Sequence, residues 1–135
     1  MDVELGIVLI VDDAPASATA LELACEGLAG IDVNVVASAP EAVRLLERED
    51  REVCAVITDV RMPDMDGFQL VTYLRGHVRH SHTPVIVVTG DTDPETPERM
   101  ARLGANAFFS KPFSPGAVRQ TLERLLHEKH TPKHA

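Results

Sequence analysis

Short runs of consecutive apolar residues recur along this chain and alternate with segments of helical periodicity. The clearest runs are residues 6–11, 53–58 and 84–88, which read GIVLIV, VCAVIT and PVIVV. A run that is apolar at every position is typical of a strand buried on both faces, and such strands belong to parallel sheets covered by helices. The pattern therefore predicts an α/β fold with helices on both sides of a parallel sheet.

Two weaker runs complete the series. Residues 31–35 alternate between apolar and polar, as expected of a strand near a sheet edge, and residues 107–110 read AFFS. Ser38 and Glu41 have the spacing of a capping box at the start of a helix, and Gly104 is placed to end one. Five strand–helix units in succession predict a sheet of five strands.

The segment after Gly67 has the periodicity of an amphipathic helix. Its apolar residues recur at helical spacing and predict one inward face, formed by Phe68, Val71, Leu74 and Val78. Three histidines follow nearby without the regular spacing of metal ligands, so we interpret them as solvated surface. They are His77, His80 and His82.

Length and charge limit the function classes. A chain of 135 residues forms one domain, predicted at residues 1–128 with a polar C-terminal tail at 129–135. The net charge of -8 argues against direct nucleic-acid binding. No apolar stretch approaches a membrane span and the N-terminus is acidic, so we expect a soluble, cytoplasmic protein without membrane contact. Cys25 and Cys54 fit core positions in a reducing compartment.

Polar residues capable of chemistry stand directly after four of the apolar runs. In a parallel sheet the carboxyl ends of the strands meet at one edge, where ligands bind at the switch point in strand order. The coincidence of four such positions therefore predicts a functional site rather than four unrelated turns. These positions are Asp12-Asp13, Asp59, Thr89-Gly90 and Lys111-Pro112.

The residue types indicate a metal ion and a phosphoryl group. Three carboxylates within about 5 Å repel one another by a few kcal/mol per pair, so a cation is expected among them. Hard oxygen ligands favour Mg²⁺, or Mn²⁺, over zinc. Asp59 could then be a nucleophile toward phosphorus, with the Thr89 hydroxyl and the Lys111 ammonium binding the remaining phosphoryl oxygens and Gly90 leaving room beside them.

Together these motifs resemble the receiver domain of bacterial two-component response regulators, chemotaxis regulators included. The resemblance covers about residues 5–128 and implies a flavodoxin-like, doubly wound sheet with strand order 2-1-3-4-5. The matching motifs, in order and spacing, are Val11-Asp12-Asp13, the loop from Asp59 to Gly67 with Met62-Pro63, Thr89-Gly90 and Lys111-Pro112-Phe113.

The resemblance implies a role for each site residue. Asp59 would accept a phosphoryl group from a phosphohistidine on a sensor histidine kinase or a phosphotransfer protein. Asp13, Asp59 and the Arg61 backbone carbonyl would bind Mg²⁺, with Asp12 assisting through water. Thr89 and Lys111 would contact the phosphoryl oxygens, and the Lys111–Pro112 peptide bond would be cis.

The resemblance also implies a switch. Phosphorylation would draw Thr89 toward the phosphoryl group, and the aromatic Phe108 would turn inward to fill the vacated space. The surface of the fourth helix, fifth strand and fifth helix would then change for a downstream protein, or for a second copy in a homodimer. The protein would catalyse only its own phosphoryl transfer and autodephosphorylation. Phe108 could instead be an ordinary core residue.

Two charged residues flank the predicted site. Arg61 lies two residues after Asp59, and Asp91 lies two residues after Thr89. We expect an exposed ion pair across the mouth of the site, and we hypothesise that it controls water attack on the acyl phosphate. A purely structural surface pair is the alternative.

Three other functions fit the sequence less well. A phosphatase of the haloacid dehalogenase type would need an acid two residues after the nucleophile, where this chain has Arg61. A flavin mononucleotide binder would need a hydroxyl-rich phosphate loop, whereas Asp12-Asp13 would repel phosphate. A phosphorylation-independent adaptor is disfavoured by the joint presence of Asp59, Thr89 and Lys111. A stand-alone regulator, a relay intermediate and a piece of a longer regulator all fit the sequence.

Overall fold

Five strands form one sheet in the computed structural model, which describes residues 6–48 and 50–130. The strand order is β2-β1-β3-β4-β5 and every pair of neighbours is parallel, so the predicted flavodoxin-like doubly wound fold is confirmed. The strands are β1 (Gly6–Val11), β2 (Ile31–Val36), β3 (Val53–Thr58), β4 (Val85–Thr89) and β5 (Ala107–Ser110).

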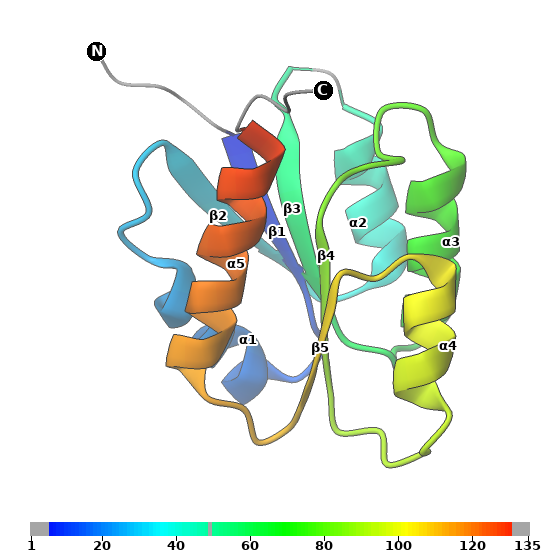
Figure 1. Ribbon diagram of the computed structural model, residues 1–135. Coiled ribbons are helices and arrows are strands. Elements are labelled where there is room, and N and C mark those ends of the chain that lie inside the picture. Colours follow the sequence, from blue (N-terminus) through cyan, green and yellow to red (C-terminus); the bar gives the residue numbers. More distant parts are fainter. Residues whose placement is uncertain (1–5, 49, 131–135) are drawn as a thin grey trace.

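Each strand is followed by a helix. In chain order the helices are α1 (Pro15–Cys25), α2 (Ala39–Leu46), α3 (Gly67–Gly76), α4 (Thr96–Leu103) and α5 (Pro115–His130). Figure 1 shows α1 and α5 on one face of the sheet and α2, α3 and α4 on the other. Within the described residues no helix is long and apolar enough to cross a membrane.

The sheet separates two apolar layers. Along β1, Val8 and Ile10 pack toward α1 and α5. Ile7, Leu9 and Val11 pack toward α2, α3 and α4. Strands β1, β3 and β4 are buried along their whole length, which explains why their sequences are apolar without alternation. Strand β2 lies at the sheet edge, as its alternating sequence predicted.

Two residues near the end of α3 differ from expectation. The helix ends at Gly76, so Val78 lies in the following turn with 89% of its surface exposed, and its predicted inward packing is wrong. His80 is buried, at 3% exposed, so its interpretation as solvated surface is also wrong. Its ring nitrogen Nε2 lies 3.0 Å from the Leu46 carbonyl at the end of α2, and this nitrogen is therefore the donor.

Two element boundaries also differ in detail. The Ser38 hydroxyl accepts from the Glu41 amide at 3.3 Å, as a cap should, but the Glu41 carboxylate accepts from the Ala37 amide rather than from Ser38. Helix α5 continues to His130 and therefore includes the first two residues of the predicted tail. The rest of that tail, 131–135, lies outside the described residues.

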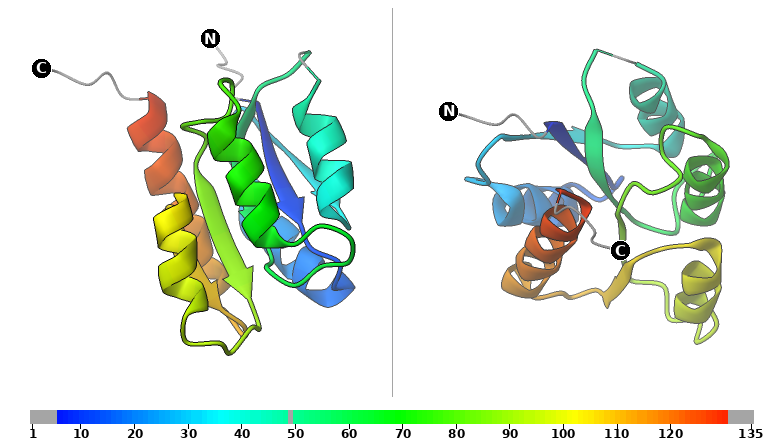
Figure 2. Two further views of the ribbon diagram at one scale, coloured as in Figure 1. Left: turned by 90° about the vertical axis from the view of Figure 1, so that its right-hand side faces the viewer. Right: turned by 45° about the horizontal axis from the view of Figure 1, so that its top comes forward.

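Two arginines join helices that are distant in sequence. Arg119 of α5 donates through Nη1 to the carbonyls of Ala24 and Glu26 at the end of α1. Arg75 of α3 donates through Nε and Nη2 to the Gly104 carbonyl at the end of α4, at 3.1 and 2.8 Å. Helices α3 and α4 lie side by side in both views of Figure 2. Charged hydrogen bonds to the last carbonyls of a helix satisfy acceptors that the helix itself leaves open.

Candidate functional site

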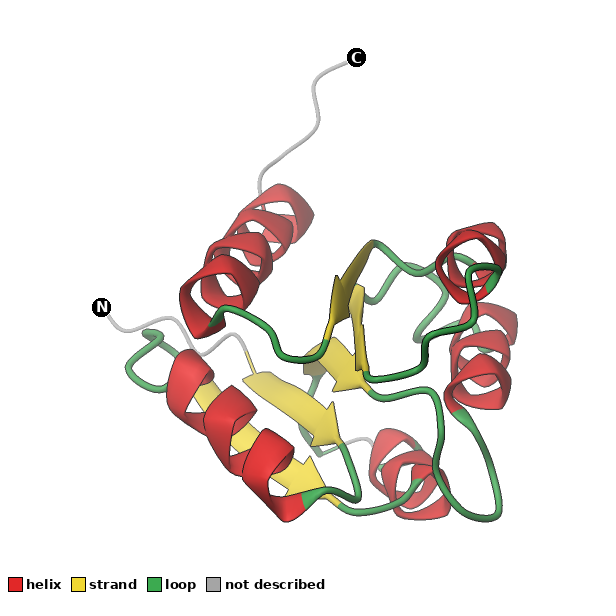
Figure 3. Cartoon of the chain, turned by 90° about the horizontal axis from the view of Figure 1, so that it is seen from below, coloured by secondary structure: helices red, strands yellow, loops and turns green. Residues whose placement is uncertain are grey.

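The carboxyl ends of the strands meet at one edge of the sheet, which Figure 3 views from below. Three acids gather there: Asp12 and Asp13 after β1, and Asp59 after β3. Oxygen atoms of the three side chains lie within 4.8 Å of one another. Asp12 and Asp59 are buried whereas Asp13 is exposed, so the cluster is open to solvent on the Asp13 side.

Backbone hydrogen bonds of the sheet hold the acids together. The Asp12 amide donates to the Val36 carbonyl of β2 at 3.1 Å, and the Asp59 amide donates to the Val11 carbonyl of β1 at 3.0 Å. These bonds extend the ladder by one residue beyond each strand. Because the backbone is fixed at both positions, the two carboxylates converge without a flexible linker between strand and site.

The loop after Asp59 returns the chain to the strand end before α3 begins. The Gly67 amide donates to the Val60 carbonyl at 2.8 Å. A Cβ atom at Gly67 would collide with the Asp59 carbonyl oxygen and would lie 2.9 Å from the Val60 Cα, so this position requires glycine for close approach. Asp66 and Gln69 then form a complete capping box for α3.

Lys111 contacts two of the acids directly. Its Nζ lies 2.8 Å from Asp59 Oδ2 and 3.1 Å from Asp12 Oδ2. Its backbone amide donates to the Thr89 carbonyl at 2.8 Å, and the Lys111–Pro112 peptide bond is cis, as the resemblance implied. Burial alone would lower the pKa of the Lys111 ammonium, but the hydrogen bonds to Asp59 and Asp12 outweigh it and raise that pKa.

Thr89 and Gly90 stand at the end of β4, beside the Lys111 backbone. The buried Thr89 hydroxyl accepts from the Asp91 amide at 3.1 Å, so one of its lone pairs is engaged within its own loop. A Cβ at Gly90 would lie 4.0 Å from the Lys111 Cβ, which is ordinary contact. The space beside Lys111 would therefore also accept a methyl group, and the predicted role of Gly90 in leaving room there stays a prediction.

Arg61 and Asp91 form the expected ion pair, with Arg61 Nη2 2.9 Å from Asp91 Oδ2. The pair is exposed on one side only, because the Arg61 side chain is 60% exposed and that of Asp91 only 10%. Asp91 Oδ1 also accepts from the Asp93 amide at 3.0 Å, and Oδ2 accepts from the Thr96 hydroxyl at 2.9 Å. These bonds, together with the Arg61 charge, lower the pKa of Asp91.

Phe108 lies in β5, paired in register with Val87 of β4. It is half-buried and packs against the core layer under α2, α3 and α4. Phe109 and Phe113 pack on the opposite layer. Of the described aromatic residues near the end of β5, Phe108 is thus the one on the α4 side, where the predicted switch requires it.

One residue near the site was not found from the sequence. Thr96, the first residue of α4, contacts Asp91 although it lies well past the end of β4. A threonine before Pro97 carries no distinctive pattern, so only the folded loop reveals it. Arg99, one helical turn later, stacks its guanidinium 3.8 Å from the centroid of the Phe68 ring.

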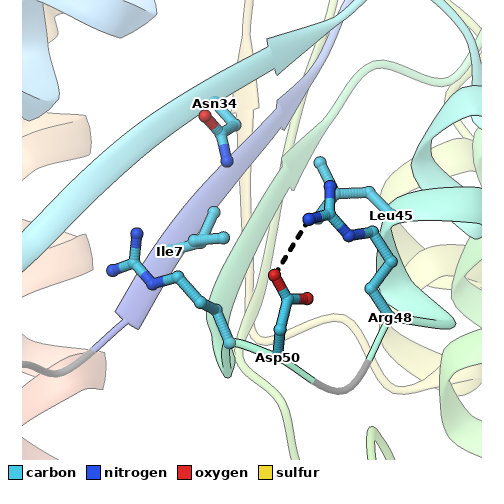
Figure 4. A pocket seen from close by; sticks show the side chains of 6 residues that line it. Ile7, Asn34, Leu45, Arg48 and Asp50 are labelled. Carbon is cyan, nitrogen blue, oxygen red and sulfur yellow. Dashed lines mark hydrogen bonds and ion pairs between the residues drawn. The ribbon is translucent and has the colours of Figure 1, made fainter.

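A cavity of about 200 Å³ lies elsewhere, between β1, β2 and the end of α2 (Figure 4). Ile7 and Asn34 line it from the sheet, and Arg48 pairs with Asp50 at its rim at 2.9 Å. Ile7 is near the start of β1 whereas Asp12 follows its end. The cavity is therefore separate from the acid cluster.

Comparisons with known proteins agree with this geometry. The family model described as response regulator receiver domain matches residues 8–123. The chain is 35% identical over 118 residues to the response regulator protein PilR of Pseudomonas aeruginosa, covering 87% of this chain but only 25% of that protein. It is 30% identical to a chemotaxis protein CheY homologue of Campylobacter jejuni, covering 87% of this chain and 90% of the homologue.

Solved structures give the same result. The signal receiver domain of a histidine kinase from Syntrophus aciditrophicus has a TM-score of 0.80 at 34% identity, covering 96% of this chain and 97% of that one. The receiver domain of the sensor kinase PA1611 from Pseudomonas aeruginosa, with a magnesium ion in its active-site cleft, has a TM-score of 0.77 at 28% identity, covering 90% and 97%. The chain belongs to the family of response regulator receiver domains and is similar to the chemotaxis regulators within it.

Proposed function

We propose that this receiver domain is a phosphorylation-activated switch in which Asp59 accepts a phosphoryl group. The observation that carries the proposal is the contact of Lys111 with Asp59 inside a cluster of three acids. A buried carboxylate beside a fixed ammonium is oriented for attack and has a cation ready for the phosphoryl oxygens. The family membership of the chain supports the same assignment.

An Asp59 carboxylate oxygen attacks the phosphorus of a phosphohistidine on a sensor histidine kinase or phosphotransfer protein. A P–O bond forms as the P–N bond breaks, and the histidine ring leaves with its electron pair and takes up a proton. Lys111 Nζ, which now bonds Asp59 Oδ2, binds a phosphoryl oxygen, and the Thr89 hydroxyl donates to another.

The donor set at the site fits Mg²⁺ or Mn²⁺. Three carboxylate oxygens within 4.8 Å of one another, partly open to solvent through Asp13, match hard cations that retain several waters. We assign Asp13, Asp59 and the Arg61 carbonyl as direct ligands and Asp12 as a residue that assists through water. The metal supplies charge neutralisation of the phosphoryl oxygens when bound.

The output of the switch is a changed protein surface rather than turnover of a second substrate. Movement of Thr89 toward the phosphoryl group ends its hydrogen bond with the Asp91 amide, and Phe108 turns further into the layer under α4. We assign the face formed by α4, β5 and α5 to a downstream protein or a second copy of the chain. The only chemistry is phosphorylation and autodephosphorylation of Asp59, in the cytoplasm.

Mass spectrometry tests the proposal directly. The protein is incubated with Mg²⁺ and acetyl phosphate beside the Asp59→Asn variant, and intact mass is measured. One phosphoryl group is expected on the wild type only, and chelation of the metal should abolish it. Absence of both an adduct and beryllofluoride binding would contradict the proposal and favour a phosphorylation-independent adaptor.

We further assign Arg61 and Asp91 as modulators of the acyl phosphate. Their ion pair joins the loop after Asp59 to the loop after Thr89, and we propose that it covers one side of the site. Removing either partner should admit water, so Arg61→Ala and Asp91→Ala should dephosphorylate several-fold faster. Unchanged rates in both variants would reduce the ion pair to a structural contact of the surface.

A further inference from the structure

Asp91 accepts hydrogen bonds from three different segments of the chain. Its Oδ2 atom accepts from Arg61 in the loop after β3 and from Thr96 at the start of α4. Its Oδ1 atom accepts from the Asp93 amide, and its own amide donates to the Thr89 hydroxyl. Asp91 is thus a junction: its amide contacts Thr89, and its carboxylate contacts Arg61 and the first turn of α4.

Thr96 is the buried member of this junction. Its residue surface is 2% exposed and its hydroxyl donates to Asp91 Oδ2 at 2.9 Å. A buried hydroxyl that lost its acceptor would remain desolvated, so the geometry strongly favours this bond. The Thr96 amide also donates to the Asp93 carbonyl at 3.1 Å, which anchors the residue at the start of the helix.

The position of the exposed Arg61 side chain depends on how the buried Thr96 hydroxyl orients Asp91. Arg61 has a long side chain that is 60% exposed, and an exposed arginine on a freely rotating carboxylate is held weakly. Asp91 does not rotate freely, because Thr96 and the Asp93 amide fix one oxygen each. The position of Arg61 is therefore set by a carboxylate that Thr96 has already oriented.

We propose that Thr96 is a positioning residue for this site: its hydroxyl orients Asp91 so that Asp91 holds Arg61 at the mouth, and it thereby couples Arg61 to the first turn of α4. The inference rests on the proposed function and adds a residue to it. Because Thr96 begins α4, a protein that displaces that turn on binding also releases Asp91 and Arg61. Coupling between two sites is reciprocal, so release of Arg61 at the site also favours the displaced turn.

The first test needs no phosphorylation. NMR measures the hydrogen exchange of the Arg61 Nε–H, which donates to Asp91 Oδ2 at 3.2 Å. Thr96→Val removes only the hydroxyl, and we expect exchange to rise by roughly tenfold. Thr96→Ser keeps the hydroxyl and should restore the wild-type rate. Thr83 is equally buried but lies before the start of β4, at the other end of the strand from Asp91. Thr83→Val is therefore the matched control and should leave the exchange rate of the Arg61 Nε–H unchanged.

Unchanged Arg61 exchange in a folded Thr96→Val protein would overturn the inference. Melting curves establish that each variant is folded, and Thr96→Ala serves as a second hydroxyl-free variant. Because the measurement uses the unphosphorylated protein, its result stands whether or not Asp59 accepts a phosphoryl group. Failure of the inference is thereby distinguished from failure of the proposed function.

The second test is a double-mutant cycle on dephosphorylation. Thr96→Val should accelerate loss of the phosphoryl group several-fold, and Arg61→Ala should accelerate it at least as much. If Thr96 acts through Arg61, the double variant should be no faster than Arg61→Ala alone. Rates that multiply would show that Thr96 acts independently of Arg61 and would contradict the positioning role.

Discussion

Lys111 shows how a single residue keeps the acid cluster stable. Its ammonium contacts Asp12 and Asp59 at 3.1 and 2.8 Å, so two of the three negative charges have a fixed positive partner. Removing one partner of a buried ion pair leaves an uncompensated charge. This explains why closely spaced carboxylates are compatible with a folded domain, and why Asp13, the exposed acid, is the one left to water or metal.

Gly67 is expected to be indispensable for the position of Asp59. Gly67→Ala would place a methyl group against the Asp59 carbonyl and 2.9 Å from the Val60 Cα, so the strand end must shift. We expect a loss of about 1–3 kcal/mol in the free energy of unfolding, as for overpacked sites, together with slower phosphorylation. Chemical denaturation and the mass assay measure the two effects.

Gly76→Ala is the matched control for Gly67. A Cβ at Gly76 meets nothing within 4 Å, and the residue ends the same helix that Gly67 begins. The control should fold and phosphorylate as the wild type does. Equal stability of the two alanine variants would mean that the loop after Asp59 adapts freely, contrary to the close approach described above.

Cys25 should make stability decline at high pH. Burial raises the pKa of its thiol to about 11, against the opposing charge of Arg119. An unfolded thiol ionises above pH ~8.5, whereas the folded one stays protonated, so stability is complete below that pH and is lost as the pH rises toward 11. The loss is on the order of 2 kcal/mol. Urea denaturation of the wild type across this range should show a steeper decline than that of Cys25→Ala.

Sequence reasoning at the residue scale succeeded where the backbone alone decides position. Asp12, Asp13 and Asp59 follow buried strands, so their proximity follows from the parallel sheet. Contacts of side chains across loops were harder to predict from the sequence. The contact of Thr96 with Asp91 and the burial of His80 depend on how loops and helix ends pack, which no periodicity encodes.

At the scale of elements, Arg75 should be the main link between α3 and the end of α4. It donates to the Gly104 carbonyl through two nitrogens and to the His80 carbonyl at 3.0 Å, and burial lowers the pKa of its guanidinium. Arg75→Ala leaves these acceptors without a charged donor and should cost about 2–3 kcal/mol. Arg75→Lys should recover little of the lost free energy of unfolding, since one ammonium cannot replace the several N–H donors of the planar guanidinium.

Arg102→Ala is the control for Arg75. Arg102 pairs with Glu98 on the exposed face of α4 at 3.2 Å, a pair worth only about 0.3–0.5 kcal/mol. Thermal unfolding should therefore separate the two variants clearly. Similar melting points would show that the end of α4 is held by apolar packing rather than by Arg75.

Element boundaries were the least predictable part of the fold. Helical periodicity assigned Val78 to α3, but the helix ends at Gly76 and the residue turns outward. Periodicity reports where apolar residues recur, not where backbone hydrogen bonding stops. The hydrogen bonds of Arg75 could not be predicted from the sequence either. Their acceptors are backbone carbonyls, of Gly104 29 residues away and of His80 5 residues away, and a carbonyl leaves no pattern in the sequence.

For the whole molecule, metal binding should appear as added stability. A cation that binds the folded acid cluster but not the unfolded chain stabilises by mass action, so Mg²⁺ should raise the melting midpoint by a few degrees. Asp13→Asn should reduce this response and, without metal, should melt at or above the wild type because one repelling charge is gone. Glu22→Gln, an exposed acid on α1, should keep the full Mg²⁺ response.

Calorimetry without and with Mg²⁺ decides this prediction. An equal Mg²⁺ response in the wild type and in Asp13→Asn would exclude Asp13 as a ligand while leaving the fold intact. The parallel α/β architecture was accessible from the sequence, because β1, β3 and β4 are apolar along their length and alternate with helical segments. The strand order came from the resemblance to receiver domains, since burial does not say which strands are neighbours.

The hydrogen bonds from Arg119 of α5 to the end of α1 form late when the chain is made on the ribosome. Helices α1 and α5 cover the same face of the sheet, yet about 90 residues separate the partners of this contact. The apolar layer on that face, which includes Val8 and Ile10, stays exposed to water on the ribosome until residues 115–130 have emerged. Only then can α5 cover it. Nascent chains halted before that point should therefore bind chaperones, and release should coincide with the arrival of the last helix.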